Sequence, residues 1–160
     1  MKHLHLIRHA KTEKVKPNQR DFDRDLTDRG RKQLNDLCHY LKESLTKFDI
    51  ILVSSAKRTK MTHGILSPLF PKNKVQFLDN LYLASADAIL NIIENLEFES
   101  SDILLIGHND GISDLVSYLL NEYQHVPTSG YVHLQLPIEH WNEVTKGCGM
   151  LVDSYFSEAL

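Results

Sequence analysis

The sequence is poor in the residues that mark several protein classes. Its 160 residues include only two cysteines, seven glycines and five prolines. Cys38 and Cys148 have neither metal-ligand spacing nor the density of a disulfide framework, which favours a reducing compartment. With 42% hydrophobic and 24% charged residues, the composition is typical of a globular protein rather than a disordered or collagen-like one. We therefore expect a single domain, residues 1–160, with a sizeable core.

Long apolar runs and an excess of basic charge are also missing. No apolar run approaches the roughly 18 residues that span a bilayer, and the first residues lack the pattern of a secretory signal. Eighteen Lys and Arg residues against 21 Asp and Glu residues give a net charge of −3. No global basic field therefore attracts nucleic acid. The sequence predicts a cytoplasmic protein without nucleic-acid or membrane partners, in which any anion site is local.

Short apolar runs alternate with helical patterns along the chain. Apolar runs bounded by polar residues predict buried strands, and apolar residues at helical spacing predict amphipathic helices. The predicted strands cover residues 3–7, 49–53, 75–77, 102–106, 131–136 and 151–155, and the predicted helices begin near residues 28, 56, 85 and 111. The helix that begins near residue 85 is expected to reach Leu96. This alternation predicts an α/β protein, a three-layer α/β/α sandwich around a mostly parallel central sheet.

The segment between the first strand and the first helix is long for a simple connection. Lys14–Asp25 contains a proline and many charges and shows no periodicity, which favours a functional flap that borders the site. It could also dock an acidic partner or be an ordinary solvated loop, and the sequence does not decide whether it closes. Thr27 is the predicted N-cap of the next helix. The apolar stripe of that helix comprises Leu34, Leu37, Cys38, Leu41 and Leu45.

Three strand-to-helix turns bring charged and histidine residues to one edge of the predicted sheet. Ligands of open α/β sheets bind outside the carboxyl ends of the strands, and here these turns contain Arg8–His9, Ser54–Arg58 and Gly107–Asp110. Guanidinium groups match the oxygens of a phosphoryl group. Nearby cations lower the pKa of a histidine and keep one ring nitrogen free as a nucleophile. The sequence therefore predicts an oxyanion site with an activated histidine and no metal ligands.

Four motifs at these positions resemble those of the histidine phosphatase superfamily, which has the phosphoglycerate mutase-like fold. They occur in the family's order, as LIRHAK at 6–11, LTDRG at 26–30, SSAKRTKMT at 54–62 and LIGHN at 105–109. The short length, the segment Leu81–Ala84 and the pair Pro127–Thr128 are similar to SixA-type phosphohistidine phosphatases. The resemblance covers nearly the whole chain.

The resemblance implies a role for each matching residue. It implies that His9 attacks phosphorus and becomes transiently phosphorylated. It also implies that three residues hold the equatorial oxygens and stabilise charge in the transition state, namely Arg8, Arg58 and His108. The implied enzyme is metal-independent and needs no cofactor. Three further residues near the site are candidates for substrate binding: Lys11, Thr12 and Thr128.

One departure from the wider superfamily concerns the leaving group. Many of its phosphomonoesterases have a glutamate in the middle loop that protonates a departing alkoxide, whereas Asn80 stands at the corresponding place here. Asp79 is a possible substitute acid, although adjacent side chains usually diverge in an extended segment. A phosphorylated imidazole with a proton on its other nitrogen departs as neutral imidazole without such an acid. The sequence therefore favours a phosphohistidine-bearing protein as the substrate, as the SixA resemblance implies.

Other interpretations of the predicted site stay open. His9 and His108 could be ordinary histidines at strand ends, and Arg8 could form a structural pair with Asp25 or Asp110. The same pocket could act on a small phosphorylated substrate, as a phosphomonoesterase with an aspartate acid. It could also be a phosphate-binding module without catalysis.

Structural roles without any catalytic or metal-binding function are also possible for Arg58, His3, His5 and Trp141. Arg58 on the first helical turn could be solvated. His3 and His5 lie on one face of the first strand and are a potential metal pair, but no third ligand has a supporting spacing, so packed histidines are favoured. Trp141, the single tryptophan, is expected to be a packing anchor.

Overall fold

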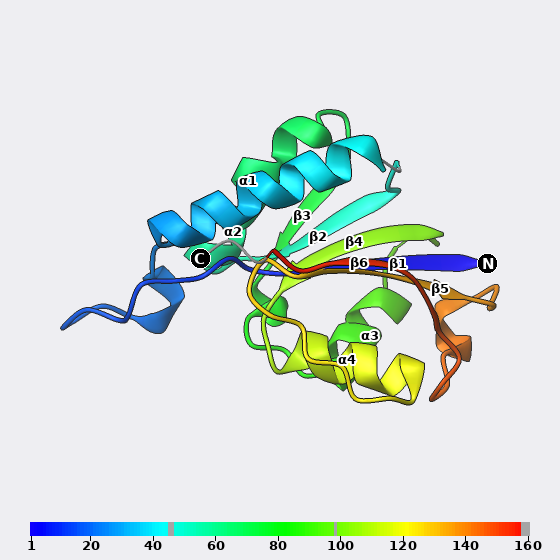
Figure 1. Cartoon of the computed structure of the whole chain (residues 1–160). Helices are drawn as coiled ribbons and strands as arrows, with labels where there is room; N and C mark the ends of the chain where they lie inside the picture. The colour runs from blue at the N-terminus through cyan, green and yellow to red at the C-terminus, as the bar shows by residue number, and fades with distance from the viewer. Residues whose placement is uncertain (45–46, 98, 158–160) are drawn as a thin grey trace.

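The computed structural model describes residues 1–44, 47–97 and 99–157. Over these ranges the chain forms a central sheet covered by helices on both faces, which confirms the predicted three-layer α/β fold (Figure 1). The strands are β1 Lys2–Arg8, β2 Ile50–Ser54, β3 Val75–Leu78, β4 Asp102–Gly107, β5 Tyr131–Leu136 and β6 Met150–Tyr155. The α-helices are α1 Asp28–Glu43, α2 Lys57–Leu66, α3 Ala86–Glu94 and α4 Gly111–Leu120.

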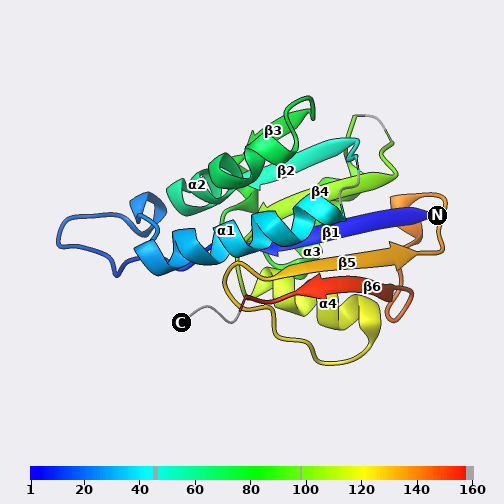
Figure 2. The ribbon, with the colours of Figure 1, turned by 45° about the horizontal axis from the view of Figure 1, so that its top comes forward.

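The sheet is parallel over its larger part. Its strands lie in the order β3-β2-β4-β1-β5-β6, which Figure 2 shows across the width of the molecule. β3, β2, β4 and β1 are parallel, β5 runs antiparallel to β1, and β6 runs antiparallel to β5. Arg8 pairs with Gly107 in register. The residues that follow β1 and β4 therefore leave the sheet side by side.

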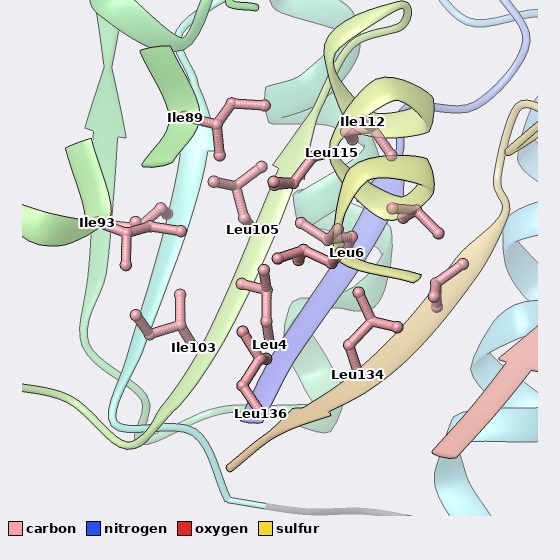
Figure 3. Packing of buried hydrophobic residues seen from close by; sticks show 14 of the residues in the cluster. Leu4, Leu6, Ile89, Ile93, Ile103, Leu105, Ile112, Leu115, Leu134 and Leu136 are labelled. Atoms are coloured by element: carbon pink, nitrogen blue, oxygen red, sulfur yellow. The ribbon is translucent and has the colours of Figure 1, made fainter. Parts of the chain in front are cut away.

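The two faces of the sheet have separate hydrophobic clusters. Because successive strand residues point to opposite faces, Leu4 and Leu6 pack with α3 and α4, whereas Ile7 packs with α1 and α2. Figure 3 shows the first cluster, in which Leu4, Leu6 and Leu105 lie beneath side chains of α3 and α4. The central strands are buried on both faces, so the sheet holds their carboxyl ends in fixed positions.

The start of α1 is anchored to the segment that follows β1. The Thr27 hydroxyl accepts a hydrogen bond from the Gly30 amide at 2.9 Å, which confirms the predicted N-cap. A Cβ added at Gly30 would lie 2.5 Å from the carbonyl oxygen of Lys11, so only glycine allows this close approach. In the predicted apolar stripe, Leu34, Leu37 and Leu41 are buried, Cys38 is half-buried, and Leu45 lies outside the described residues.

The predicted flap and one predicted helix differ in detail from expectation. A bridge between Thr12 and Leu26 closes the base of the flap, and Asp21–Asp23 form a 3-10 turn within it. The flap extends beyond the edge where the parallel strands end (Figures 1 and 2). The helix expected to reach Leu96 ends at Glu94, because Asn95 caps it and its amide donates to carbonyls of the last turn.

Trp141, His3 and His5, which lie away from the carboxyl ends of the parallel strands, are packed within the protein as expected. The Trp141 indole is buried and donates to the Ser100 carbonyl at 2.7 Å. His3 and His5 are hydrogen-bonded within the protein, to His133 at 2.9 Å and to Tyr131 at 2.8 Å. The described ranges contain no group of three or more His, Cys, Asp or Glu residues that could hold a metal ion. Nor does any helix described there have the length and apolar character needed to cross a membrane.

Candidate active site

A cavity of about 410 Å³ lies where β1, β2 and β4 end. It gathers residues from the turns after these strands, from the flap and from two later loops. The lining residues are Arg8, His9, Lys11, Thr12, Asp21, Arg24, Arg58, Leu83, His108, Asn109 and Thr128. The seven residues proposed from the sequence for catalysis and substrate binding, apart from the possible acid, therefore lie around one cavity.

The sheet register brings the two histidines together. The His9 amide donates to the Gly107 carbonyl at 3.0 Å and extends the pairing of β1 with β4 by one residue. The ring centroids of His9 and His108 are consequently 5.2 Å apart. Two histidines from opposite halves of the chain thus share one buried site, with exposed fractions of 7% and 2%.

The His9 ring is held in one tautomer by a backbone contact. Its Nδ1 lies 2.7 Å from the Ala10 carbonyl oxygen, which can only accept, so Nδ1 carries the proton and Nε2 carries the lone pair. The Ala10 amide donates in turn to the Thr62 hydroxyl at 3.1 Å. The threonine at the end of the Ser54–Thr62 motif therefore fixes the backbone that orients His9.

His108 is oriented by the first residue of the same motif. Its Nε2 lies 2.7 Å from the hydroxyl of Ser54, which is fully buried at the end of β2. The Ser54 hydroxyl can donate to Nε2, which then leaves the proton on Nδ1. Ser54 is the first residue of the SSAKRTKMT motif, and its contact with His108 was not predicted from the sequence.

Burial is the main cause of the low basicity of both histidines. Burial, then the charges of Arg58, Arg8 and Arg24, lower the pKa of His9 to about 4, although its bond to the Ala10 carbonyl acts in the opposite direction. Burial and the neighbouring His9 lower the pKa of His108 to about 3. The predicted effect of cations is present, but it is smaller than that of burial. Both rings are neutral at neutral pH.

The two predicted arginines have different partners. Arg58 is 2% exposed rather than solvated, and it donates to the backbone oxygen of Asp21 at 2.8 Å and to its carboxylate at 2.9 Å. Arg8 donates to the Val126 carbonyl at 3.2 Å. It forms no ion pair with a carboxylate of the described residues, and Asp25 pairs with Lys57 instead.

Several donors around the cavity are buried without a partner. Within the part of the chain that the structure describes, these atoms are the Nε atoms of Arg8, Arg24 and Arg58 and the Nδ1 atom of His108. A buried donor without an acceptor costs about 1–3 kcal/mol. A tetrahedral oxyanion supplies several acceptors at once, and its charge matches the guanidinium groups. The donor set of this cavity therefore fits a phosphoryl group.

Two residues that line the cavity, Asp21 and Arg24, and one that contacts lining residues, Tyr82, were not predicted from the sequence. Asp21 and Arg24 lie in the flap, which was expected to border the site, and Tyr82 lies in the segment already noted as SixA-like. The Tyr82 hydroxyl donates to the Asp21 carboxylate, and its ring packs edge-to-face against His108 with centroids 5.5 Å apart. The predicted flap pointed to Asp21 and Arg24, and the SixA-like segment Leu81–Ala84 pointed to Tyr82. Neither signal predicted a specific contact.

The possible acid does not lie at the cavity. Asp79 is exposed in the 3-10 turn Asp79–Leu81, and it is absent from the cavity lining. Asn80 is also exposed and borders a separate cavity beside β2 and α3. Leu83 is the residue of this loop that reaches the cavity, with a φ of +51° and 55% exposure.

Comparisons with known proteins agree with this geometry. Residues 4–82 match the model of the histidine phosphatase superfamily, branch 1. Uncharacterized proteins from two strains of Mycobacterium tuberculosis are 27% identical over 160 residues, which covers 91% of this chain and 96% of theirs.

Solved structures share the fold over almost the full length. A protein from Agrobacterium tumefaciens named as the phosphohistidine phosphatase SixA has a TM-score of 0.84 and 24% identity, with 98% of each chain covered. The protein histidine phosphatase SixA complexed with tungstate has a TM-score of 0.77 and 18% identity, with 95% of each chain covered. The chain therefore resembles the histidine phosphatase superfamily in its four ordered motifs and in the family model that matches residues 4–82, and it has the phosphoglycerate mutase-like fold.

Proposed function

We propose that this protein is a phosphatase that removes the phosphoryl group from phosphohistidine on a protein, through a covalent intermediate on His9. The observation that carries the proposal is the state of the His9 ring. Its Nδ1 proton is held by the Ala10 carbonyl, and burial keeps the ring neutral. Nε2 is therefore a nucleophile in a cavity rich in guanidinium groups.

The first step is phosphoryl transfer from the substrate to His9. A bond forms between Nε2 of His9 and phosphorus, the phosphorus–nitrogen bond of the substrate breaks, and the departing imidazole keeps the electron pair. Arg8, Arg58 and His108 donate to the phosphoryl oxygens and stabilise their charge during transfer. Their partnerless buried nitrogens are the donors that this role requires.

The second step returns the nucleophile to its resting state. A water oxygen bonds to phosphorus, the bond from phosphorus to Nε2 breaks, and its electron pair returns to His9. The Nδ1 proton remains on the ring, so the ring leaves as neutral imidazole, and the protons of water stay with the phosphate product. No external acid is needed in either step when the leaving group is an imidazole that already carries a proton.

Two observations favour phosphohistidine over alkyl phosphates. Asp79, the possible acid, is exposed outside the cavity. Asp21 lines the cavity, but hydrogen bonds from Tyr82 and Arg58 outweigh the opposing effect of burial and lower its pKa to about 2, so it holds no proton to donate at neutral pH. The names of the SixA neighbours, one of them bound to the oxyanion tungstate, point to the same class of substrate.

Labelling of His9 tests the proposal. Brief incubation with a ³²P-phosphohistidine peptide should label the wild-type chain, and acid-labile label should be lost from His9→Ala together with turnover. His39→Ala, on the exposed part of α1, is the matched control and should keep both. Turnover by His9→Ala at the wild-type rate would contradict the assignment of the nucleophile, and a wild-type chain that binds phosphate without labelling would be a binding module.

A substrate panel tests the choice of substrate. The phosphohistidine peptide and p-nitrophenyl phosphate should be hydrolysed with higher kcat/KM than sugar phosphates and other alkyl phosphates. Only the alkyl esters must release an alkoxide, which is strongly basic and therefore a poor leaving group. A preference for the alkyl esters would favour a small-molecule phosphomonoesterase instead.

A further inference from the structure

One carboxylate faces a cavity that is otherwise lined by cations and neutral groups. Among the described lining residues only Asp21 is acidic. Its Oδ2 accepts from Nη2 of Arg58 at 2.9 Å and from the Tyr82 hydroxyl, and its Oδ1 lies 2.9 Å from Nη2 of Arg24. These donors, acting against burial, keep the carboxylate ionised at neutral pH.

Asp21 has room for one more donor. A carboxylate offers about four lone-pair positions, and three of them are used, two on Oδ2 and one on Oδ1. Its side chain is 45% exposed, whereas His9 and Arg58 are 7% and 2% exposed. The cavity therefore has a buried floor, where the phosphoryl group is held, and an open rim, where Asp21 lies. The leaving group of a protein substrate must lie toward this rim.

We infer that the free position on Oδ1 of Asp21 accepts a hydrogen bond from the N–H of the departing imidazole, and that Asp21 thereby selects phosphorylated imidazoles as substrates. This inference rests on the proposed function. The carboxylate stabilises the proton on the ring nitrogen remote from phosphorus. The phosphorus–nitrogen bond then breaks with its electron pair on the near nitrogen, and neutral imidazole leaves with that proton. Aryl and alkyl esters have no such N–H and gain nothing from the contact.

A simpler role for Asp21 is to position Arg58. Its backbone oxygen and its carboxylate accept from Nη1 and Nη2 of Arg58, and this leaves Nε and one proton on each terminal nitrogen for the phosphoryl group. Loss of this positioning weakens the hold on phosphorus whatever the leaving group is. The two roles therefore differ in how the loss depends on the substrate.

The test compares Asp21→Asn with wild type on two substrates and one inhibitor. The substrates are a phosphohistidine peptide and p-nitrophenyl phosphate, whose nitrophenolate leaves without a proton, and the inhibitor is inorganic phosphate. Asp23→Asn is the matched control, since Asp23 lies in the same turn and pairs with Arg20 at 2.8 Å outside the cavity lining. Thermal unfolding of each variant shows that the fold is retained.

We expect Asp21→Asn to lose at least about tenfold more kcat/KM on the phosphohistidine peptide than on p-nitrophenyl phosphate, the size of one lost charge-assisted hydrogen bond. Inhibition by phosphate should be unchanged or stronger, because a negative charge has been removed. Equal losses on both substrates, or a matching loss of phosphate inhibition, would overturn the inference and leave Asp21 as a positioning residue. If wild type fails to hydrolyse the phosphohistidine peptide, the proposed function itself is wrong.

Discussion

At the scale of the residue, the chemistry depends on which nitrogen of His9 carries the proton. A free histidine has two tautomers, and only the contact between Nδ1 and the Ala10 carbonyl selects the one with a lone pair on Nε2. The low pKa of the ring then follows mainly from its burial, and secondarily from the nearby guanidinium groups. A histidine of ordinary pKa would be partly protonated, and so unreactive, in mildly acidic solution.

The lowered pKa of His9 predicts how both the ring and the fold respond to pH. A proton NMR titration should place the midpoint of the His9 ring near 4, against 6.5 for the urea-unfolded chain. Between these values the unfolded chain binds more protons than the folded one, so the free energy of unfolding should fall as pH drops from about 6.5 toward 4. A folded-state midpoint close to 6.5 would contradict the burial argument.

At the scale of the element, two glycines allow helices to approach the loops that line the site. Gly30 brings α1 against Lys11, and Gly111 brings the start of α4 against the loop that ends in Leu83 and Ala84. A Cβ added at Gly111 would lie 1.9 Å from the Ala84 carbonyl oxygen. The position of Leu83 at the cavity therefore depends on a residue of α4 without a side chain.

Gly111→Ala should lower stability and activity together. The added methyl group must displace the backbone of Ala84, at a cost of about 1–3 kcal/mol typical of overpacking. Urea denaturation measures this cost, and kcat/KM on p-nitrophenyl phosphate reports the shift at the cavity. Gly64→Ala is the opposite case, because nothing lies within 4 Å of its added Cβ in α2. This control should gain about 0.5–1 kcal/mol of stability and keep full activity, and equal behaviour of the two variants would refute the packing argument.

At the scale of the whole molecule, the charge of the cavity is opposite to that of the protein. The net charge is −3, whereas Arg8, Lys11, Arg24 and Arg58 line the cavity with Asp21 as the single acidic residue described there. The distribution of charge, rather than its sum, therefore attracts the anion. Fields of this kind are screened by salt over about 10 Å at 0.1 M ionic strength.

Inhibition by inorganic phosphate should consequently weaken severalfold when NaCl is raised from low concentration to about 0.5 M. Lys11→Gln should weaken inhibition at low salt and flatten this dependence. Lys72→Gln is the control, because Lys72 lies before β3 and beside the start of β2. It is therefore at the amino ends of the parallel strands, away from the cavity at their carboxyl ends. The same salt response in Lys11→Gln and wild type would argue against a role for Lys11 in attracting the anion.

Much of the architecture and part of the candidate site follow from local patterns. Apolar runs bounded by polar residues mark the strands, because strands buried on both faces contain apolar side chains throughout. Motif order then placed Arg8, His9, Arg58 and His108 at strand ends, where the structure brings them together. The contacts of Asp21 with Arg24 and Tyr82 were not foreseen, since loops have no periodicity that links one segment to another.

The sequence by itself determined the succession of strands and helices along the chain, the N-cap at Thr27 and the identity of the residues at each strand end. These properties depend on residues that are neighbours along the chain. Only the tertiary structure decided that the flap folds back to place Asp21 on Arg58, and that Asp79 is turned outside the cavity. Such placements depend on contacts between segments far apart in sequence. These contacts can form, and stabilise the loops, only after the sheet has brought the segments together.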